Sequence, residues 1–399
     1  MANIKSRMLT NAPRFSYLPD DDRFLSKRET PQFTINVIGT GINGQEHMQV
    51  TEFEGRGSIH GIYDPNPGSI RAAKAIMKEM GKDLVIYDDL VSACNDPKVD
   101  ALIISTPNYT HREVLDVAIQ SGKHILLEKP MATTLKDAYH IMQLSEQYEA
   151  VFQIGLQYRY KSIYRESVFE ALERKSLGDI KQISIQEHRI PFLDKVGQWN
   201  KFSEYSGGTL VEKCCHYFDL FNLFAQAKPV RVFAVGDQSV NFKDFEKNGK
   251  KSDIIDQAFV IVEYENGVKA SFNLCMFAPM FYEEMVLCGT KGRLKVNEKN
   301  DFISQKGLEC SMEMNLGESQ PSRYIIPHYP KHIEDAGHHG ATFFEHVNFI
   351  DNMLGKETNS AKVSEGFWSV VVGAAAQESI KQQRPILIDE LLVQNDINL

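Results

Sequence analysis

Apolar and polar positions alternate in a regular pattern through the first 155 residues. Apolar runs typical of buried strands lie near residues 35–38, 59–63, 84–86, 100–105, 124–127 and 151–154. Segments with helical spacing separate them, beginning near 43 and covering 68–80, 89–95, 110–121 and 135–148. Alternation of strands and helices predicts a parallel sheet with helices on both faces, a Rossmann dinucleotide-binding domain over 31–155.

The pattern changes after Gly155. A helix near 162–175 precedes period-two runs over 180–187, 230–235, 257–263 and 269–274, which predict a large, open, mostly antiparallel sheet. Helical patterns follow over 342–354 and 364–382, and a short strand is expected over 385–389. We therefore expect an α/β chain whose second domain, 156–390, binds substrate and forms oligomers, with its helix near 364–383 packing back on the first domain.

The turn after the first strand contains three glycines at the spacing of a dinucleotide-binding loop. Gly39 allows a sharp turn, Gly41 allows a pyrophosphate to approach the backbone, and Gly44 allows the helix to press on the strand. Ile42 and Asn43 begin the helix and offer free N–H groups to phosphate. Glycines also collect at ordinary turns, so the motif is informative here because strand and helix flank it.

The end of the second apolar run supplies an acidic residue. Asp64 follows Gly44 by 20 residues, and a carboxylate there accepts the ribose hydroxyls of NAD and repels the 2′-phosphate of NADP. Arg71 lies nearby and could instead contact a 2′-phosphate. The sequence therefore favours NAD as cofactor, with NADP as the alternative.

Composition and charge narrow the class of partner. The 399 residues are 42% hydrophobic and 24% charged, and the net charge is −9 without a long Lys/Arg cluster, which argues against nucleic-acid or membrane partners. We find no leader pattern and no long apolar segment, and we expect a cytoplasmic protein that acts on a small molecule. Six scattered cysteines indicate reduced thiols rather than a disulfide framework.

Residues 1–30 are polar and have no sustained period, so they predict an extended arm before the fold. The outward face of the period-two strands would stay exposed in a monomer, which predicts a homo-oligomer, from dimer to hexamer. The arm could then contact a neighbouring subunit.

The loop after the strand at 100–105 lies where parallel strands line a cofactor crevice. Thr106, Pro107 and Asn108 are expected to touch the cofactor ribose. His111 follows in the same loop and is assigned to the cofactor site, although a first-turn helix residue without catalytic work is the more common role for such a histidine.

The next strand delivers Glu128, Lys129 and Pro130 at its carboxyl end. Proline keeps the preceding lysine extended, so its side chain projects toward the crevice. A lysine beside a cofactor and a desolvated substrate can have its pKa lowered toward neutrality and exchange a proton with a hydroxyl. Considered in isolation, the tripeptide is typical of an exposed turn. Its place after a parallel strand beside the glycine loop instead favours a catalytic site.

A third group follows the glycine pair at 207–208. Glu212, His216 and Asp219 have the spacing of one helical face, where the carboxylate can raise the pKa of the histidine and orient it. The alternative is an amphipathic helix with a surface pair. Zinc binding by Cys214, Cys215 and His216 is disfavoured because adjacent helical residues point apart, and we expect no metal.

Together these motifs resemble the Gfo/Idh/MocA oxidoreductase family over nearly all of residues 34–390. The resemblance implies a Rossmann domain, a second domain whose open sheet forms the subunit interface, and hydride transfer at a sugar or cyclitol carbon. It also implies that Lys129 and His216 are the catalytic pair and that Glu128 contacts the nicotinamide ribose. The family usually has aspartate at the position of Glu212, a third catalytic candidate, so the division of roles among the three stays open.

We expect an NAD-dependent dehydrogenase of a secondary alcohol in a sugar, a glycoside (at C3) or a cyclitol. The alternatives are an NAD-dependent glycoside hydrolase or lyase that acts through a 3-keto intermediate, and a sensor that binds dinucleotide or sugar without catalysis. Aromatic residues and histidines of the second domain could stack on a sugar or pack an interface. The residues assigned to substrate binding are Arg159, Tyr160, His188, Trp199 and His339.

Overall fold

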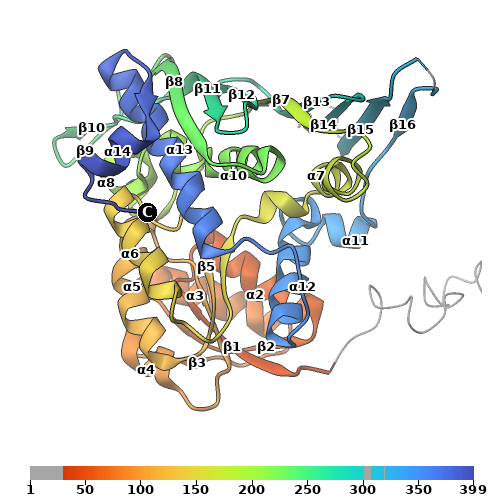
Figure 1. Ribbon diagram of the computed structural model, residues 1–399. Coiled ribbons are helices and arrows are strands. Elements are labelled where there is room, and N and C mark those ends of the chain that lie inside the picture. Colours follow the sequence, from red (N-terminus) through yellow and green to blue (C-terminus); the bar gives the residue numbers. More distant parts are fainter. Residues whose placement is uncertain (1–29, 301–306, 319) are drawn as a thin grey trace, which may run out of the picture.

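The computed structural model describes residues 30–300, 307–318 and 320–399 (Figure 1). The predicted arm over residues 1–30 lies outside the described residues except for residue 30. Two sheets organise the described chain, with the first at the bottom of Figure 1 and the second across its top.

The first sheet is parallel and six-stranded within the described residues, in the order β3-β2-β1-β4-β5-β6. Its strands are β1 (Phe33–Ile38), β2 (Gly57–Tyr63), β3 (Val85–Ile86), β4 (Ala101–Ile104), β5 (His124–Glu128) and β6 (Phe152–Gly155). The helices between them are α2 (Ile42–Glu54), α3 (Pro67–Glu79), α4 (Leu90–Asn95), α5 (His111–Ala118) and α6 (Leu135–Ser145). The predicted alternation and the Rossmann topology are confirmed, because apolar strands such as β4 are buried on both faces by these helices.

The second sheet is nine-stranded within the described residues, in the order β16-β15-β14-β13-β7-β12-β11-β8-β17. The β7 and β12 strands are parallel neighbours and the other pairs are antiparallel, so the predicted mostly antiparallel sheet is confirmed. The strands are β7 (Ile180–His188), β8 (Pro229–Asp237), β11 (Gln257–Tyr264), β12 (Lys269–Cys275), β13 (Phe281–Gly289), β14 (Arg293–Asn300), β15 (Leu308–Asn315), β16 (Arg323–Ile325) and β17 (Ile386–Leu387). A small hairpin pairs β9 (Glu246–Lys247) with β10 (Lys250–Lys251).

Helices of the second domain lie between the two sheets and at the edges (Figure 1). They are α7 (Ser162–Val168, continued by a π-helix over Phe169–Glu173), α8 (Ser203–Ser206), α9 (Thr209–Glu212), α10 (Cys215–Ala225), α11 (Lys331–Glu334), α12 (Ala341–Met353), α13 (Val363–Gln382) and α14 (Ile388–Gln394). Helix α13 contacts α10 and β8 of its own domain and α6 of the Rossmann domain, and α12 contacts α2. These contacts place helices of the second domain directly against the first.

Two local predictions differ from the structure. The helix expected around Glu212 and His216 is broken into α9 and α10, and the Cys214 N–H bonds the Thr209 carbonyl at 3.3 Å across the break. Gly207 and Gly208 precede α9 with positive φ, and the Glu212 carbonyl at the end of α9 accepts a hydrogen bond from Lys129 Nζ at 2.9 Å. At the C-terminus, the expected strand shrinks to β17 and is followed by α14, which the sequence pattern did not predict.

The cysteines and the helix lengths bear on where the chain can be found. All six cysteines lie among the described residues and are free thiols, as expected. Within the described ranges, every helix is too short or too polar to cross a membrane.

Gly44 closes the turn between β1 and α2, and its replacement is a direct test of this geometry. A Cβ at Gly44 would lie 2.1 Å from the Gly39 carbonyl oxygen, whereas a Cβ at Gly41 would meet nothing within 4 Å. We expect Gly44→Ala to lower the free energy of unfolding by about 2 kcal/mol or more, because backbone must move. Gly41→Ala is the matched control and should keep wild-type stability in thermal unfolding. Equal stability of the two variants would contradict the tight β1–α2 turn.

Candidate active site

A cavity of about 1000 Å³ opens at the carboxyl ends of the parallel strands. Loops after β1, β2, β4 and β5 line one side, and residues 194–205 and 247–250 of the second domain line the other. Predicted cofactor-binding residues that line it are Gly39, Gly41, Ile42, Asn43, Asp64, Thr106, Pro107, Asn108, Glu128 and Lys129. The structure therefore brings together residues from four loops that are far apart in the sequence.

The cavity wall fits a dinucleotide. No side chain caps the N-terminus of α2, so its first N–H groups remain available beside Ile42 and Asn43. The space over Gly41 is open for a phosphate. Asp64 Oδ2 accepts the Thr40 N–H at 2.7 Å and the Thr40 hydroxyl at 3.2 Å. Asp64 Oδ1 accepts the Asn66 N–H at 2.7 Å, which fixes the carboxylate after β2 and leaves one Oδ1 lone pair for a ribose hydroxyl.

Two predicted cofactor residues lie behind the wall instead of in it. Gly44 packs against the Gly39 backbone. His111 is fully buried, with its ring nitrogens 2.9 Å from the Pro130 carbonyl oxygen and 3.0 Å from the Thr106 carbonyl oxygen. His111 thus joins the loops that follow β4 and β5 and does not face the cavity, as its position in the first turn of α5 suggested.

Lys129 extends from the end of β5 to the second domain. Its Nζ donates to the Glu212 carbonyl oxygen at 2.9 Å and lies 3.8 Å from Glu212 Oε1. Burial alone would lower the pKa of Lys129, but Glu212, together with Cys215, Glu128 and Tyr158, outweighs burial and the pKa is raised. The expected shift toward neutrality is therefore wrong for this arrangement, and Lys129 is a buried cation.

Glu212 is the anion at the centre of the site. Burial raises the pKa of its carboxyl, but Lys129 and Lys195 outweigh that effect and lower it to about 2. Lys195 Nζ lies 3.6 Å from Glu212 Oε1 and 4.8 Å from the centre of the Trp199 ring. Lys195 lines the cavity and was missed by the sequence analysis, because an isolated lysine in an irregular loop gives no periodic signal.

His216 is buried at the start of α10 and stacks on Tyr158, with ring centroids 4.0 Å apart and ring planes 9° apart. Burial, reinforced by Lys129 and Lys213, lowers the pKa of His216 well below its ordinary value. The expectation that Glu212 raises this pKa is wrong, since Glu212 is engaged by lysines. His216 is a neutral imidazole, and within the described chain its Nδ1 has no hydrogen-bond partner.

Asp219, the third residue of the predicted helix face, has a structural partner. Asp219 accepts two hydrogen bonds of 2.6 Å from Arg159, whose guanidinium also contacts Glu365 at 3.1 Å. Arg159 and the adjacent Tyr160 are buried and do not line the cavity. Neither of these predicted substrate-binding side chains reaches the cavity, because both are held inside the second domain.

The remaining substrate-binding candidates are dispersed. Trp199 lines the cavity and packs edge-on against Tyr109, with ring centroids 6.4 Å apart. His188 lies on β7 near Tyr282, and His339 Nε2 lies 3.9 Å from Glu298, both outside the cavity lining. Trp199 is thus the member of the predicted substrate set that the structure brings to the cavity.

Comparisons with known proteins agree with this arrangement. Residues 33–156 match the family described as "Oxidoreductase family, NAD-binding Rossmann fold", and residues 170–388 match "Oxidoreductase family, C-terminal alpha/beta domain". The chain belongs to this Gfo/Idh/MocA oxidoreductase family, and its first domain is the NAD-binding domain.

Among sequence relatives, myo-inositol 2-dehydrogenase of Thermotoga maritima is 22% identical, covering 90% of this chain and 99% of the relative. The NAD-dependent scyllo-inositol 2-dehydrogenase of Bacillus subtilis is 23% identical, covering 88% and 95% of the two chains. A solved levoglucosan dehydrogenase in complex with NADH and L-sorbose has a TM-score of 0.74 at 17% identity, covering 90% and 99%.

The low pKa of Glu212 makes a prediction about acid stability. Because the folded-state pKa lies below the ordinary 4.5, the carboxylate stabilises the fold above about pH 4.5 and loses this effect as the pH falls toward 2. We expect Glu212→Gln to lower the free energy of unfolding by about 3 kcal/mol at pH 7 and by progressively less in acid. Denaturant unfolding across this pH range measures the difference.

Glu204→Gln is the matched control, because Glu204 forms an exposed ion pair with Lys250. This control should unfold like the wild type at every pH. A Glu212→Gln deficit that stays constant down to pH 2 would contradict the charged state assigned to Glu212.

Proposed function

We propose that this protein transfers hydride between NAD and a secondary alcohol carbon of a sugar, glycoside or cyclitol. The observation that supports this most is the pairing of opposite proton states in two buried side chains, Lys129 in the lining of the cofactor cavity and His216 outside it. Lys129 is a buried cation that lines the cavity, and His216 is a neutral imidazole with an unpartnered nitrogen. The relatives reported above, named for two inositols and levoglucosan, support this substrate class.

The proton states suggest how the pair divides the work. The Lys129 ammonium can donate a hydrogen bond to the alcohol oxygen and stabilise the negative charge that develops there. The neutral His216 can accept the hydroxyl proton as general base. Bound NAD supplies the hydride acceptor. In this proposal Glu212 keeps Lys129 protonated, so the lysine is the electrophile and the histidine is the base.

The rim of the same region favours a carbohydrate over an apolar substrate. Trp199 and Lys195 both line the cavity, with Lys195 Nζ over the Trp199 ring at 4.8 Å from its centre. Aromatic faces stack on the C–H faces of sugars while charged groups bind hydroxyls. The relatives reported above carry dehydrogenase names, so the hydrolase or lyase alternative has no support from them, and we propose the dehydrogenase alone.

The central test separates chemistry from cofactor binding. Lys129→Met and His216→Gln should each lower kcat by roughly 10²- to 10⁴-fold on a panel of inositols, free sugars and glycosides, because the first removes the electrophile and the second removes the general base. NADH affinity, measured by fluorescence titration, should change little. Lys136→Met, at an exposed position on α6, is the matched control and should be fully active.

NADH formation on the panel is followed by absorbance, and release of the aglycone from glycosides is assayed beside it. Near-normal turnover of His216→Gln would assign α10 a structural role only. Aglycone release without net NADH formation would favour the hydrolase or lyase reaction.

We also propose that the chain forms a homo-oligomer through the outer face of the second sheet. On β8 and β11, Phe233, Val235, Phe259 and Ile261 point away from the buried face, and Phe259 is 58% exposed. Cross-strand pairs join Phe233 to Ile261 and Val235 to Phe259, which makes the apolar surface continuous.

Replacement of one residue on this face tests the proposed interface. We expect light scattering at micromolar concentration to give a dimer or larger for the wild type and a smaller species for Phe259→Lys, since a buried charge destabilises an apolar contact. Val91→Lys changes a similarly exposed residue on α4 and should leave the mass unchanged. A monomeric wild type would refute the interface.

A further inference from the structure

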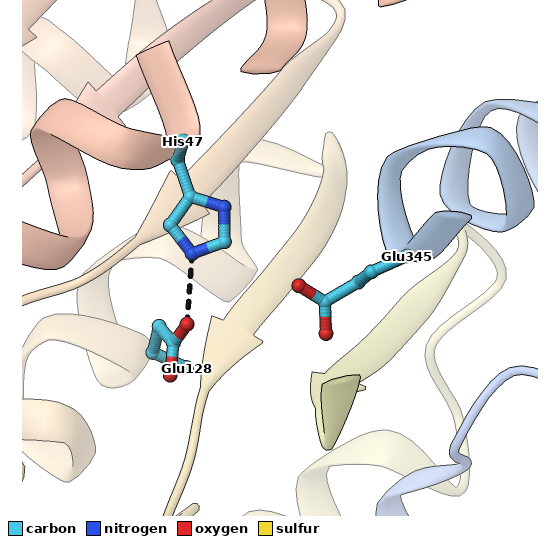
Figure 2. Close-up of side chains that lie close together, drawn as sticks. All are labelled: His47, Glu128 and Glu345. Carbon is cyan, nitrogen blue, oxygen red and sulfur yellow. Dashed lines mark hydrogen bonds and ion pairs between the residues drawn. The ribbon is translucent and has the colours of Figure 1, made fainter. Parts of the chain in front are cut away.

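Behind Glu128, three elements bring together ionisable side chains that the proposed reaction does not use. His47 comes from α2, Glu128 from the end of β5, and Glu345 from α12, and one ligand atom from each lies within 4.8 Å of the others. Figure 2 shows His47 above Glu128, with the Glu345 carboxylate directed toward both. Glu128 also lines the NAD cavity, so this buried cluster reaches the cofactor site.

The hydrogen-bond chain behind His47 has a defined direction. The Thr51 hydroxyl donates its single proton to the His47 carbonyl oxygen at 2.8 Å, so toward His346 Nδ1, at 3.2 Å, it can only accept. His346 therefore has its proton on Nδ1. Burial, with His47 beside it, lowers the pKa of His346 well below its ordinary value, so its Nε2 is a bare acceptor.

This direction fixes the protons on His47. Its Nδ1 lies 2.8 Å from His346 Nε2 and must donate to it. Its other nitrogen, Nε2, lies 2.8 Å from Glu128 Oε1. A neutral His47 with its proton on Nδ1 would place a bare nitrogen against a carboxylate oxygen, so one further proton must lie between the two atoms.

That proton belongs on His47. Glu128 Oε2 accepts the Lys129 backbone N–H at 3.0 Å, and a donor at this oxygen favours the ionised carboxylate. Burial alone would raise the pKa of Glu128, but the contact with His47, with further help from Lys129, lowers it. The pair is therefore an imidazolium and a carboxylate, both buried, and its geometry leaves the Glu128 carboxylate little freedom.

Glu345 completes the cluster as a neutral acid. It is fully buried, and both of its carboxylate oxygens have no hydrogen-bond partner within the described chain. Burial, with Glu128 and Glu46 nearby, raises the pKa of Glu345 well above its ordinary value. The cluster then holds one positive charge, on His47, and one negative charge, on Glu128. His338 pairs with Glu46 and is not part of this charge balance.

We propose that His47 is a positioning residue that is protonated on both ring nitrogens and, as an imidazolium, holds Glu128 in the wall of the NAD cavity. His346 and Thr51 fix the His47 ring from behind. The inference rests on the proposed contact between Glu128 and the cofactor ribose, and it does not depend on which alcohol is the substrate.

NADH affinity of the full-length protein, measured without substrate, tests the role. His47→Phe keeps the ring shape but removes both donors, and we expect NADH to bind roughly 10- to 100-fold more weakly. His47→Gln restores one N–H donor and should recover part of the loss. His140→Phe removes an exposed histidine paired with Asp116 and is the matched control with wild-type affinity.

Thermal unfolding of the same variants separates positioning from packing. A positioning role predicts weaker NADH binding by His47→Phe at temperatures where the variant remains folded. Unchanged NADH affinity of folded His47→Phe would overturn the proposal.

A second variant distinguishes the positioning role of His47 from the contact between Glu128 and the cofactor. Glu128→Gln should also weaken NADH binding. If Glu128→Gln binds NADH normally, the contact between Glu128 and the cofactor is wrong. If only Glu128→Gln binds weakly while folded His47→Phe binds normally, the contact stands and the positioning role of His47 is wrong.

The proton state itself is measured on the wild type, so the test survives a variant that fails to fold. In protein labelled with ¹⁵N-histidine, both ring nitrogens of His47 should show the shifts of an imidazolium at pH 8, with the signal assigned through its bonds to the His47 backbone. A bare Nε2 would overturn the proposal. One tightly bound metal ion per chain in elemental analysis would also overturn it, because the metal would then replace the proton between His47 and Glu128.

Discussion

The site depends on one buried ion pair, between Lys129 at the end of β5 and Glu212 at the end of α9. Neither side chain is more than 9% exposed, and an unpaired charge at this depth would be strongly unfavourable. Lys129 also donates to the Glu212 backbone at 2.9 Å, so a residue of the parallel sheet is tied to a short helix of the second domain at two points. The position of one domain on the other therefore enters directly into the chemistry of the site.

The proton states at the site follow from this pair. Glu212 holds Lys129 as a cation, and that cation, together with burial, keeps His216 neutral. The cationic donor, Lys129, lines a cavity whose wall fits a dinucleotide, and the neutral acceptor, His216, is buried outside this lining. On the far side of Glu128, the imidazolium proposed for His47 would hold a second buried carboxylate in one orientation in the same way.

The sequence pattern predicted those features of the fold that are set by residues close together in the chain. Strand periodicity and the spacing of Gly39, Gly41 and Gly44 gave the Rossmann topology, because sheet order and turn geometry follow from local constraints. The place of Lys129 after β5 was predictable for the same reason. Its proton state was not, since it depends on Glu212, which lies 83 residues away in the chain.

Other parts of the site were hidden because they arise from tertiary contacts. The break between α9 and α10 removed the single helical face expected for Glu212, His216 and Asp219. Arg159 has the residue type of a ligand-binding group, but the structure pairs it with Asp219. The partners of His47 come from β5 and α12, so no spacing in the sequence could have indicated their contact.

The central claim is that an alcohol oxygen binds between Lys129 and His216 beside the cofactor. A crystal structure of the protein with NADH and a cyclitol or sugar that it oxidises measures this directly. We expect the reacting oxygen within hydrogen-bond distance of Lys129 Nζ and of a His216 ring nitrogen, with Glu212 still beside the lysine. A bound substrate whose reacting oxygen contacts neither side chain would contradict it.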